Sequence, residues 1–245
     1  TSRYYREALP EWVKAFNAEG RVQSAFGRSW ERLLEPAVYE RVQGPDNDAA
    51  ESDGVGLGRT FPHPITGGKA MISPAFFTAF DNSPFASEFL GAFVERAIRE
   101  EKLGRNTGTD LLCVSFSQVD VVGHNYGPDS QEVMDAVVRI DRVVASLLAC
   151  IDREVGLDRC VIVFSADHGV APLPERILAR DPSTPAGRIK ITDLDAAAKK
   201  ALDAAYGALP KGESWFVRDN AGYHLRPETL AARKIETDAA ARLVK

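Results

Sequence analysis

The stretch from Asp110 to Gly169 constrains the fold most strongly, because it contains two short apolar runs joined by a long amphipathic segment. Residues 111–119 and 160–166 each have about the length of a buried strand, and the second run is β-branched at its centre. Asp129 and Glu132 fit the N-terminal cap of a helix between them. The apolar residues of that helix recur at steps of three and four: Val133, Val137, Ile140, Val144, Leu147, Ile151 and Val155. The pattern predicts a right-handed βαβ unit with parallel strands.

Each predicted strand ends in an aspartate and a histidine. Asp120 and His124 follow the first run, and Asp167 and His168 follow the second. In open α/β sheets ligands bind at the carboxyl ends of the strands, so these four side chains are expected to converge at one edge. A set of nitrogen and oxygen donors suits zinc or a similar divalent ion better than calcium. Two half-sets suggest two ions about 3.5–4 Å apart, the arrangement used for displacement at phosphorus.

A structural interpretation of the same residues remains open. Asp167 and His168 could cap the turn after a strand, with the aspartate accepting hydrogen bonds from nearby backbone N–H groups. Asp120 and His124 could form a surface ion pair. Both pairs at matching ends of two strands favour the metal interpretation.

Longer stretches of the chain resemble a known enzyme group. VSFSQVDVVGHNYGPDSQEVMDAVVRIDRVVASLL and FSADHGVAPLPE are similar to the alkaline phosphatase superfamily, most closely to its type I phosphodiesterase/phosphatase branch and the bacterial PafA-type alkaline phosphatases. YYREALPEWVKAFNAEG and SPFASEFLGAFVERAIREEKLG also resemble that group, so the likeness covers most of residues 4–175. The resemblance implies an α/β fold, a three-layer sandwich whose largely parallel sheet is flanked by helices.

The resemblance also implies roles for the four candidate residues. In this family Asp-x-x-x-His supplies two ligands to one zinc ion, which would be Asp120 and His124 here. The Asp-His pair supplies ligands to the other, which would be Asp167 and His168. Two divalent ions are therefore expected as cofactors, zinc in preference to manganese. The resemblance further implies a periplasmic or secreted location.

The chain departs from the family in two places. Family members carry a metal-binding Asp and a Thr or Ser nucleophile well upstream of this match, so the nucleophile is expected outside this chain. They also carry a third zinc-binding His far downstream. His224, in GYHLRP, lacks the Gly that usually follows that ligand and is not expected to replace it. The chain alone is therefore expected to have little or no turnover.

Three functions remain in competition. The first is phosphate monoester hydrolysis, favoured by the YYREALP and SPFASEF likeness. The second is a phosphodiesterase or nucleotide pyrophosphatase on the same scaffold, since the residues that separate mono- from diesters lie upstream. The third is a non-catalytic binding or packing module that keeps only the core. The substrate is expected to be a small phosphate ester, and the oligomeric state stays open.

Composition excludes other classes of function. Hydrophobic residues make up 44% and charged residues 27% of the 245, as in an ordinary globular protein. The net charge of −5 argues against a nucleic-acid-binding surface. No apolar run approaches the roughly 20 residues of a membrane span. The three cysteines have no Cys-x-x-Cys spacing and are expected to be buried thiols.

The sequence is expected to contain two regions. Residues 1–175 form the metal-binding α/β core, and residues 176–245 form an α+β insertion that resembles a cap and is truncated. Within the core, residues 43–58 are rich in Gly, Asp and Asn and predict a loop. His63 follows in FPHPITGG and is not expected to bind metal, although a part in a substrate loop stays open. Within the insertion, SWFVRD and GYHLR flank Asn220 and Ala221 and predict a hairpin.

Overall fold

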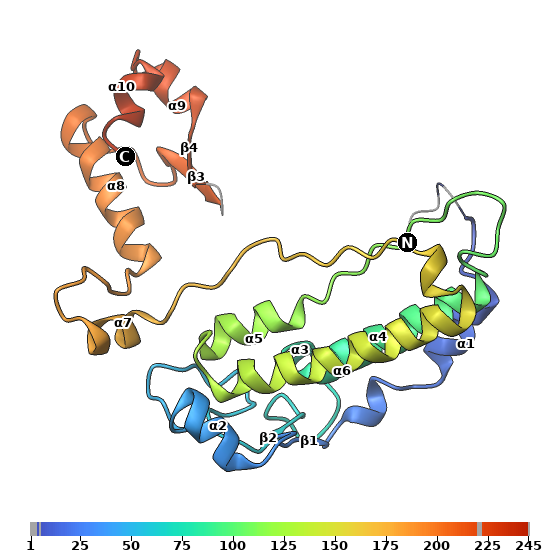
Figure 1. Cartoon of the computed structure of the whole chain (residues 1–245). Coiled ribbons are helices and arrows are strands. Elements are labelled where there is room, and N and C mark those ends of the chain that lie inside the picture. Colours follow the sequence, from blue (N-terminus) through green and yellow to red (C-terminus); the bar gives the residue numbers. More distant parts are fainter. Residues whose placement is uncertain (1–3, 5, 220–221, 245) are drawn as a thin grey trace. The chain divides into compact units, whose positions relative to one another are not determined.

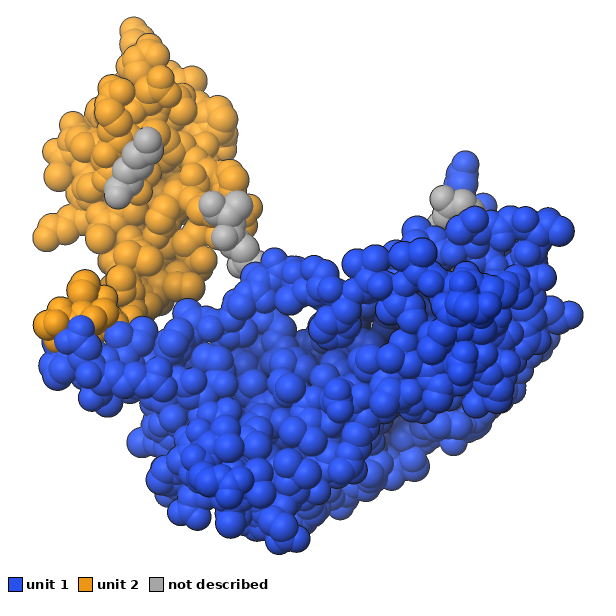
Figure 2. Space-filling view, in the orientation of Figure 1, with its two compact units in different colours: residues 1–182 blue, residues 183–245 orange. Residues whose placement is uncertain are grey.

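The chain is described by a computed structural model that covers residue 4, residues 6–219 and residues 222–244. It divides into two compact units, unit 1 from Thr1 to Pro182 and unit 2 from Ser183 to Lys245 (Figures 1 and 2). The expected boundary lies between residues 175 and 176, whereas in the structure the helix at 174–180 belongs to unit 1. Within the described ranges, no helix has both the length and the apolar character needed to cross a bilayer.

Unit 1 is mainly helical. Its elements, in chain order, are α1 (Glu11–Ala18), a 3₁₀ turn (Gln23–Ala25), β1 (Ser29–Trp30), α2 (Pro36–Gln43), β2 (His63–Pro64), α3 (Pro74–Asp81), α4 (Pro84–Glu100), α5 (Gln118–Tyr126), α6 (Gln131–Glu154), a 3₁₀ turn (Leu157–Arg159) and α7 (Pro174–Arg180). Helices α4, α5 and α6 pack against one another, and α4 and α6 run side by side (Figure 1). Strands β1 and β2 form a short antiparallel pair in which Trp30 lies opposite His63.

Aromatic side chains fill the core of unit 1. Trp30, Phe76 and Tyr126 are fully buried, and they come from β1, α3 and α5. The Trp30 ring lies edge-on to the Phe61 ring at 5.4 Å between centroids. This core fixes the position of α5, the helix that carries Asp120 and His124.

The two predicted strands do not form a sheet. Residues 111–116 and 160–166 are extended, but among the described residues neither takes part in a β-ladder. Val161 is 94% exposed and Phe164 is 83% exposed, so their apolar side chains are uncovered. The first run also ends earlier than predicted, because Gln118 already begins α5. A strand exists only where a neighbouring strand supplies its hydrogen bonds, and that partner is not encoded in the run itself.

The helix predicted between the two apolar runs is confirmed as α6, but its predicted cap is wrong. Ser130, not Asp129, is the N-cap, and its side chain accepts a hydrogen bond from the N–H of Val133. Glu132 is completely buried and bonds His63 instead of closing a capping box. The apolar face predicted for this helix is only partly covered, with Val137 47% exposed.

Unit 2 has its own small core. It contains α8 (Ile191–Tyr206), the antiparallel strands β3 (Phe216–Asp219) and β4 (Gly222–Leu225), α9 (Pro227–Ala232) and α10 (Thr237–Ala241). Leu202, Trp215, Leu230 and Ala240 are buried together. Strands β3 and β4 confirm the predicted hairpin, whose turn residues Asn220 and Ala221 lie outside the described residues.

Candidate metal centre

Asp120 and His124 lie one helical turn apart on α5. This spacing puts both side chains on the same face, and His124 Nε2 is 3.4 Å from Asp120 Oδ2. The His124 side chain is 71% exposed, whereas that of Asp120 is 38% exposed. The structure therefore places the first pair on the helix that follows the extended run, not at the end of a strand.

Asp167 and His168 directly follow the second extended run. His168 Nε2 is 3.5 Å from Asp167 Oδ2, and both side chains are exposed. His168 Nδ1 lies 3.0 Å from the carbonyl oxygen of Gly169. Because a carbonyl oxygen only accepts, Nδ1 carries the proton, and in the neutral ring Nε2 keeps its lone pair.

The two pairs lie within electrostatic reach of each other. The hydrogen bond to the Gly169 carbonyl raises the pKa of His168, and the carboxylates of Asp167 and then Asp120 raise it further. Val170, just after the second pair, lies against Gly123 of α5.

An orphaned oxygen marks the first pair as a place where a cation fits. Asp120 Oδ1 is buried and has no hydrogen-bond partner, a condition that costs free energy unless a donor or a cation meets the atom. Two carboxylates and two imidazoles are also the donor types that zinc takes. Within the described ranges, however, no three His, Cys, Asp or Glu side chains lie close enough to enclose an ion. The donors fit a divalent ion, but they are not gathered into one closed site.

Polar side chains that the sequence analysis did not single out hold α5 in place. Asn125 Nδ2 donates to Asn82 Oδ1 and to the carbonyl oxygen of Val121. The backbone oxygen of Asn125 accepts a 2.9 Å hydrogen bond from Ser52, in the loop of residues 43–58. The buried hydroxyl of Tyr126 donates to the Gly58 carbonyl at 2.9 Å. The only sequence signal for Asn125 and Tyr126 is their position next to His124.

Neither of the other two histidines joins the candidate centre. His63 is fully buried, with Nε2 3.1 Å from Glu132 Oε1 and Nδ1 3.2 Å from the carbonyl oxygen of Leu57. Its ring packs 5.0 Å from that of Trp30, so it belongs to the core of unit 1. His224 lies on β4 in unit 2, with Nε2 2.9 Å from Asp219 Oδ2.

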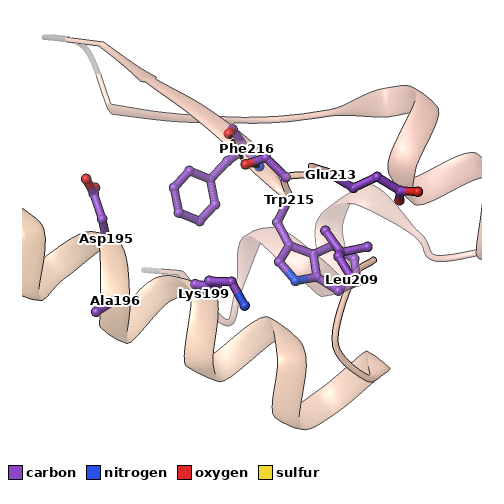
Figure 3. Close-up of a pocket in the computed structure, with 8 residues that line it drawn as sticks. Asp195, Ala196, Lys199, Leu209, Glu213, Trp215 and Phe216 are labelled. Carbon is purple, nitrogen blue, oxygen red and sulfur yellow. Dashed lines mark hydrogen bonds between the residues drawn. The ribbon is translucent and has the colours of Figure 1, made fainter. Parts of the chain in front are cut away.

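Unit 2 contains a hollow of about 280 Å³ that none of the four candidate ligands lines (Figure 3). Trp215 and Phe216 form part of its wall, with Asp195 and Lys199 from α8. The two charges are already paired inside the unit: Asp195 accepts from Arg218 at 2.9 Å, and Lys199 bonds Asp203.

Comparison with known proteins decides the family. The sequence pattern of the type I phosphodiesterase / nucleotide pyrophosphatase family matches residues 3–242. The chain belongs to this family. It is 30% identical to a Myroides odoratus protein named calcium-transporting ATPase, over all of this chain and 44% of that protein. It is also 30% identical to the alkaline phosphatase PhoV of Synechococcus elongatus, over 80% of this chain and 35% of PhoV.

A solved structure gives the fold. The crystal structure of alkaline phosphatase PafA matches with a TM-score of 0.85 at 28% identity, over all of this chain and 46% of that one. The chain thus has the alkaline-phosphatase-like α/β fold in the part that it spans. It spans less than half the length of each of these relatives.

Proposed function

We propose that the natural protein containing this chain hydrolyses phosphoric esters at a centre that holds two divalent metal ions. Asp120 and His124 would bind one ion, and Asp167 and His168 the other. Two observations carry the proposal: Val170, two residues after His168, lies against Gly123 of α5, and Asp120 Oδ1 is buried and unpartnered. Membership of the phosphodiesterase / pyrophosphatase family supports the same reaction class.

Divalent ions in such a centre polarise phosphoryl oxygens and lower the pKa of a bound hydroxyl group or water. The residues of this chain would prepare that environment. Asp120 and Asp167 would offset positive charge, and His124 and His168 would complete the donor set. The Gly169 carbonyl would hold His168 in the tautomer whose Nε2 is free to bind. Zinc is proposed in preference to manganese because of the two imidazoles.

The preferred substrate class is a phosphate monoester. PhoV and PafA, both named alkaline phosphatases, resemble most of this chain. A phosphodiester or nucleotide pyrophosphate is the second candidate, since the family takes its name from those activities. The Thr or Ser nucleophile is proposed to lie outside the 245 residues.

The finer architecture is also a proposal. Residues 111–116 and 160–166 would pair as parallel strands of a larger sheet between two helical layers. This pairing is supported by two apolar side chains that suit a covered sheet but are exposed here: Leu111 is 87% exposed and Val163 is 84% exposed. Forming that sheet would bring the residues after each strand to one edge.

Hydrolysis of an aryl phosphate monoester and the matching diester by the natural protein tests the proposal. Loss of a ligand through Asp167→Ala or His124→Ala is expected to reduce the rate by more than the roughly 10–100-fold typical of losing an outer-sphere partner. A chelator is expected to abolish turnover, and the control His224→Ala to leave it unchanged. Full activity in both ligand variants would overturn the proposed function. Faster hydrolysis of the diester would instead favour the second candidate.

A further inference from the structure

The segment after the second Asp–His pair docks on the helix that carries the first pair. A Cβ atom added to Gly123 would lie 3.4 Å from Val170 Cγ2, and one added to Gly127 would lie 2.7 Å from Leu173 Cγ. A glycine within α5 and another just after it thus allow residues 170–173 to approach closely. These contacts hold the two segments together without any strand pairing.

Arg176 adds a charged clamp to this apolar contact. Its Nε lies 2.9 Å from Asp48 Oδ2, and its Nη2 lies 3.7 Å from Glu51 Oε1. The ion pair is largely removed from water, since the Arg176 side chain is 21% exposed and that of Asp48 is 27% exposed. A partly buried pair is screened less than a surface pair, and removing Arg176 leaves the Asp48 charge uncompensated.

The loop that receives Arg176 is itself bonded to α5. Ser52 follows Glu51, and its N–H donates to the Asn125 carbonyl at 2.9 Å. The Ser52 hydroxyl lies 3.2 Å from Asn125 Oδ1. Asn125 follows His124 directly. A continuous path therefore runs from α7 through the loop to the first Asp–His pair.

We propose that Arg176 is a positioning residue that sets the Asp167–His168 pair relative to the Asp120–His124 pair. This inference rests on the proposed function. Arg176 touches neither pair and acts through Asp48, Glu51 and the loop. The planar guanidinium ion-pairs with Asp48 while lying beside the buried Glu51 side chain, a placement that the single ammonium of lysine reproduces less well.

A second arginine of α7 provides a matched control. Arg180 Nη2 lies 3.0 Å from Asp129 Oδ2, but the Arg180 side chain is 65% exposed. Exposed ion pairs of this kind contribute little to stability. Arg180→Ala therefore removes the same type of charge from the same helix without removing the clamp.

The test uses the natural protein with Arg176→Ala, Arg176→Lys and Arg180→Ala. The first readout is amide hydrogen exchange of residues 167–173 in metal-free protein, and the second is the affinity for Zn²⁺ at each of the two sites. Arg176→Ala is expected to speed exchange and to weaken one zinc site by about tenfold, the lower end of the effect of removing a group bonded directly to a ligand. Arg176→Lys is expected to be intermediate, and Arg180→Ala to match the wild type. Circular dichroism checks that each variant is folded.

The outcomes separate the two proposals. Unchanged exchange in folded Arg176→Ala would overturn the positioning role whether or not metal binds. Faster exchange with both zinc affinities unchanged would also overturn it, because the clamp would then serve stability alone. A wild-type protein that binds no zinc and hydrolyses no ester would overturn the proposed function itself, and the inference with it.

Discussion

At the scale of single residues, the carboxyl group of Glu51 is strongly perturbed. The residue is buried, and its Oε2 has no hydrogen-bond partner. Burial, followed by the charges of Glu132 and Asp48, raises its pKa from 4.5 to about 8. Arg176 opposes this rise in pKa but does not cancel it. Glu51 therefore keeps its proton at neutral pH in the folded chain.

The raised pKa of Glu51 predicts a pH dependence of stability. The folded state binds this proton more tightly than the unfolded state does, so protonation of Glu51 stabilises the fold fully below pH 4.5. This stabilisation is lost as the pH rises towards about 8. A difference of one between the folded and unfolded pKa values corresponds to about 1.4 kcal/mol. Urea unfolding of Glu51→Gln is therefore expected to show a smaller fall in unfolding free energy between pH 5 and pH 8.

Glu40 is exposed, so Glu40→Gln is the control, and its unfolding free energy is expected to fall with pH as in the wild type. A fall with pH that is equally steep in Glu51→Gln would contradict the assignment. No sequence pattern pointed to this group, because Glu51 lies in a polar, glycine-rich loop that is typical of solvent-exposed segments. Two of the charged groups that act on it, Glu132 of α6 and Arg176 of α7, are distant along the chain.

At the scale of secondary-structure elements, the two extended segments expose an unusual amount of apolar surface. Unpaired extended backbone with apolar side chains is a template for association. The 245-residue chain alone is therefore expected to self-associate, and Val163→Lys to reduce this in sedimentation velocity. Val163 is 84% exposed, so the substitution is expected to leave unfolding unchanged.

Val137→Lys tests whether any added charge has the same effect. Val137 is 47% exposed but lies within α6, whose backbone hydrogen bonds are satisfied. Association that falls equally in both variants would show that net charge, not the extended segment, governs it. A wild-type chain that stays monomeric would contradict the prediction outright.

Helices were more predictable than strands for a physical reason. The signals for α6 are local, because its apolar spacing lies within one segment. The predicted cap of α6 is one residue too early because Asp129 and Ser130 are both good caps; in the structure Ser130 accepts from the N–H of Val133, whereas Asp129 pairs with Arg180. Strand formation in residues 160–166 depends on a neighbour that the segment itself cannot specify.

At the scale of the whole molecule, the two units have separate cores, and this predicts separate unfolding. Leu202 is fully buried in unit 2 with Trp215, whereas Trp30 is buried in unit 1. Leu202→Ala is expected to destabilise unit 2 by about 2–5 kcal/mol and to leave unit 1 unchanged. Fluorescence of single-tryptophan variants that retain Trp215 or Trp30 measures each unit.

Leu243 is 40% exposed, so Leu243→Ala is the control and is expected to leave the stability of unit 2 unchanged. One transition that shifts for both tryptophans in Leu202→Ala would contradict the independence of the two cores. The sequence could not locate the packing of α7. That helix joins unit 1 through long-range contacts of Arg176.

The sequence proposes the residues of the candidate centre but not their geometry. The Asp-x-x-x-His and Asp-His spacings single out Asp120, His124, Asp167 and His168 without any structure. The sequence could not show that the first pair lies on α5 or that Asp120 Oδ1 is left without a partner. Nor could it reveal Arg176, whose partners lie in a distant loop.

Whether the two Asp–His pairs form a metal centre is decided by the metal content of the natural protein, measured by mass spectrometry after purification without chelator. We expect up to two divalent ions per molecule, with zinc preferred. Asp120→Ala and His168→Ala are each expected to lower that content, and His224→Ala to leave it unchanged. A folded wild-type protein without bound divalent metal, or one whose metal survives both ligand substitutions, would contradict the proposed centre.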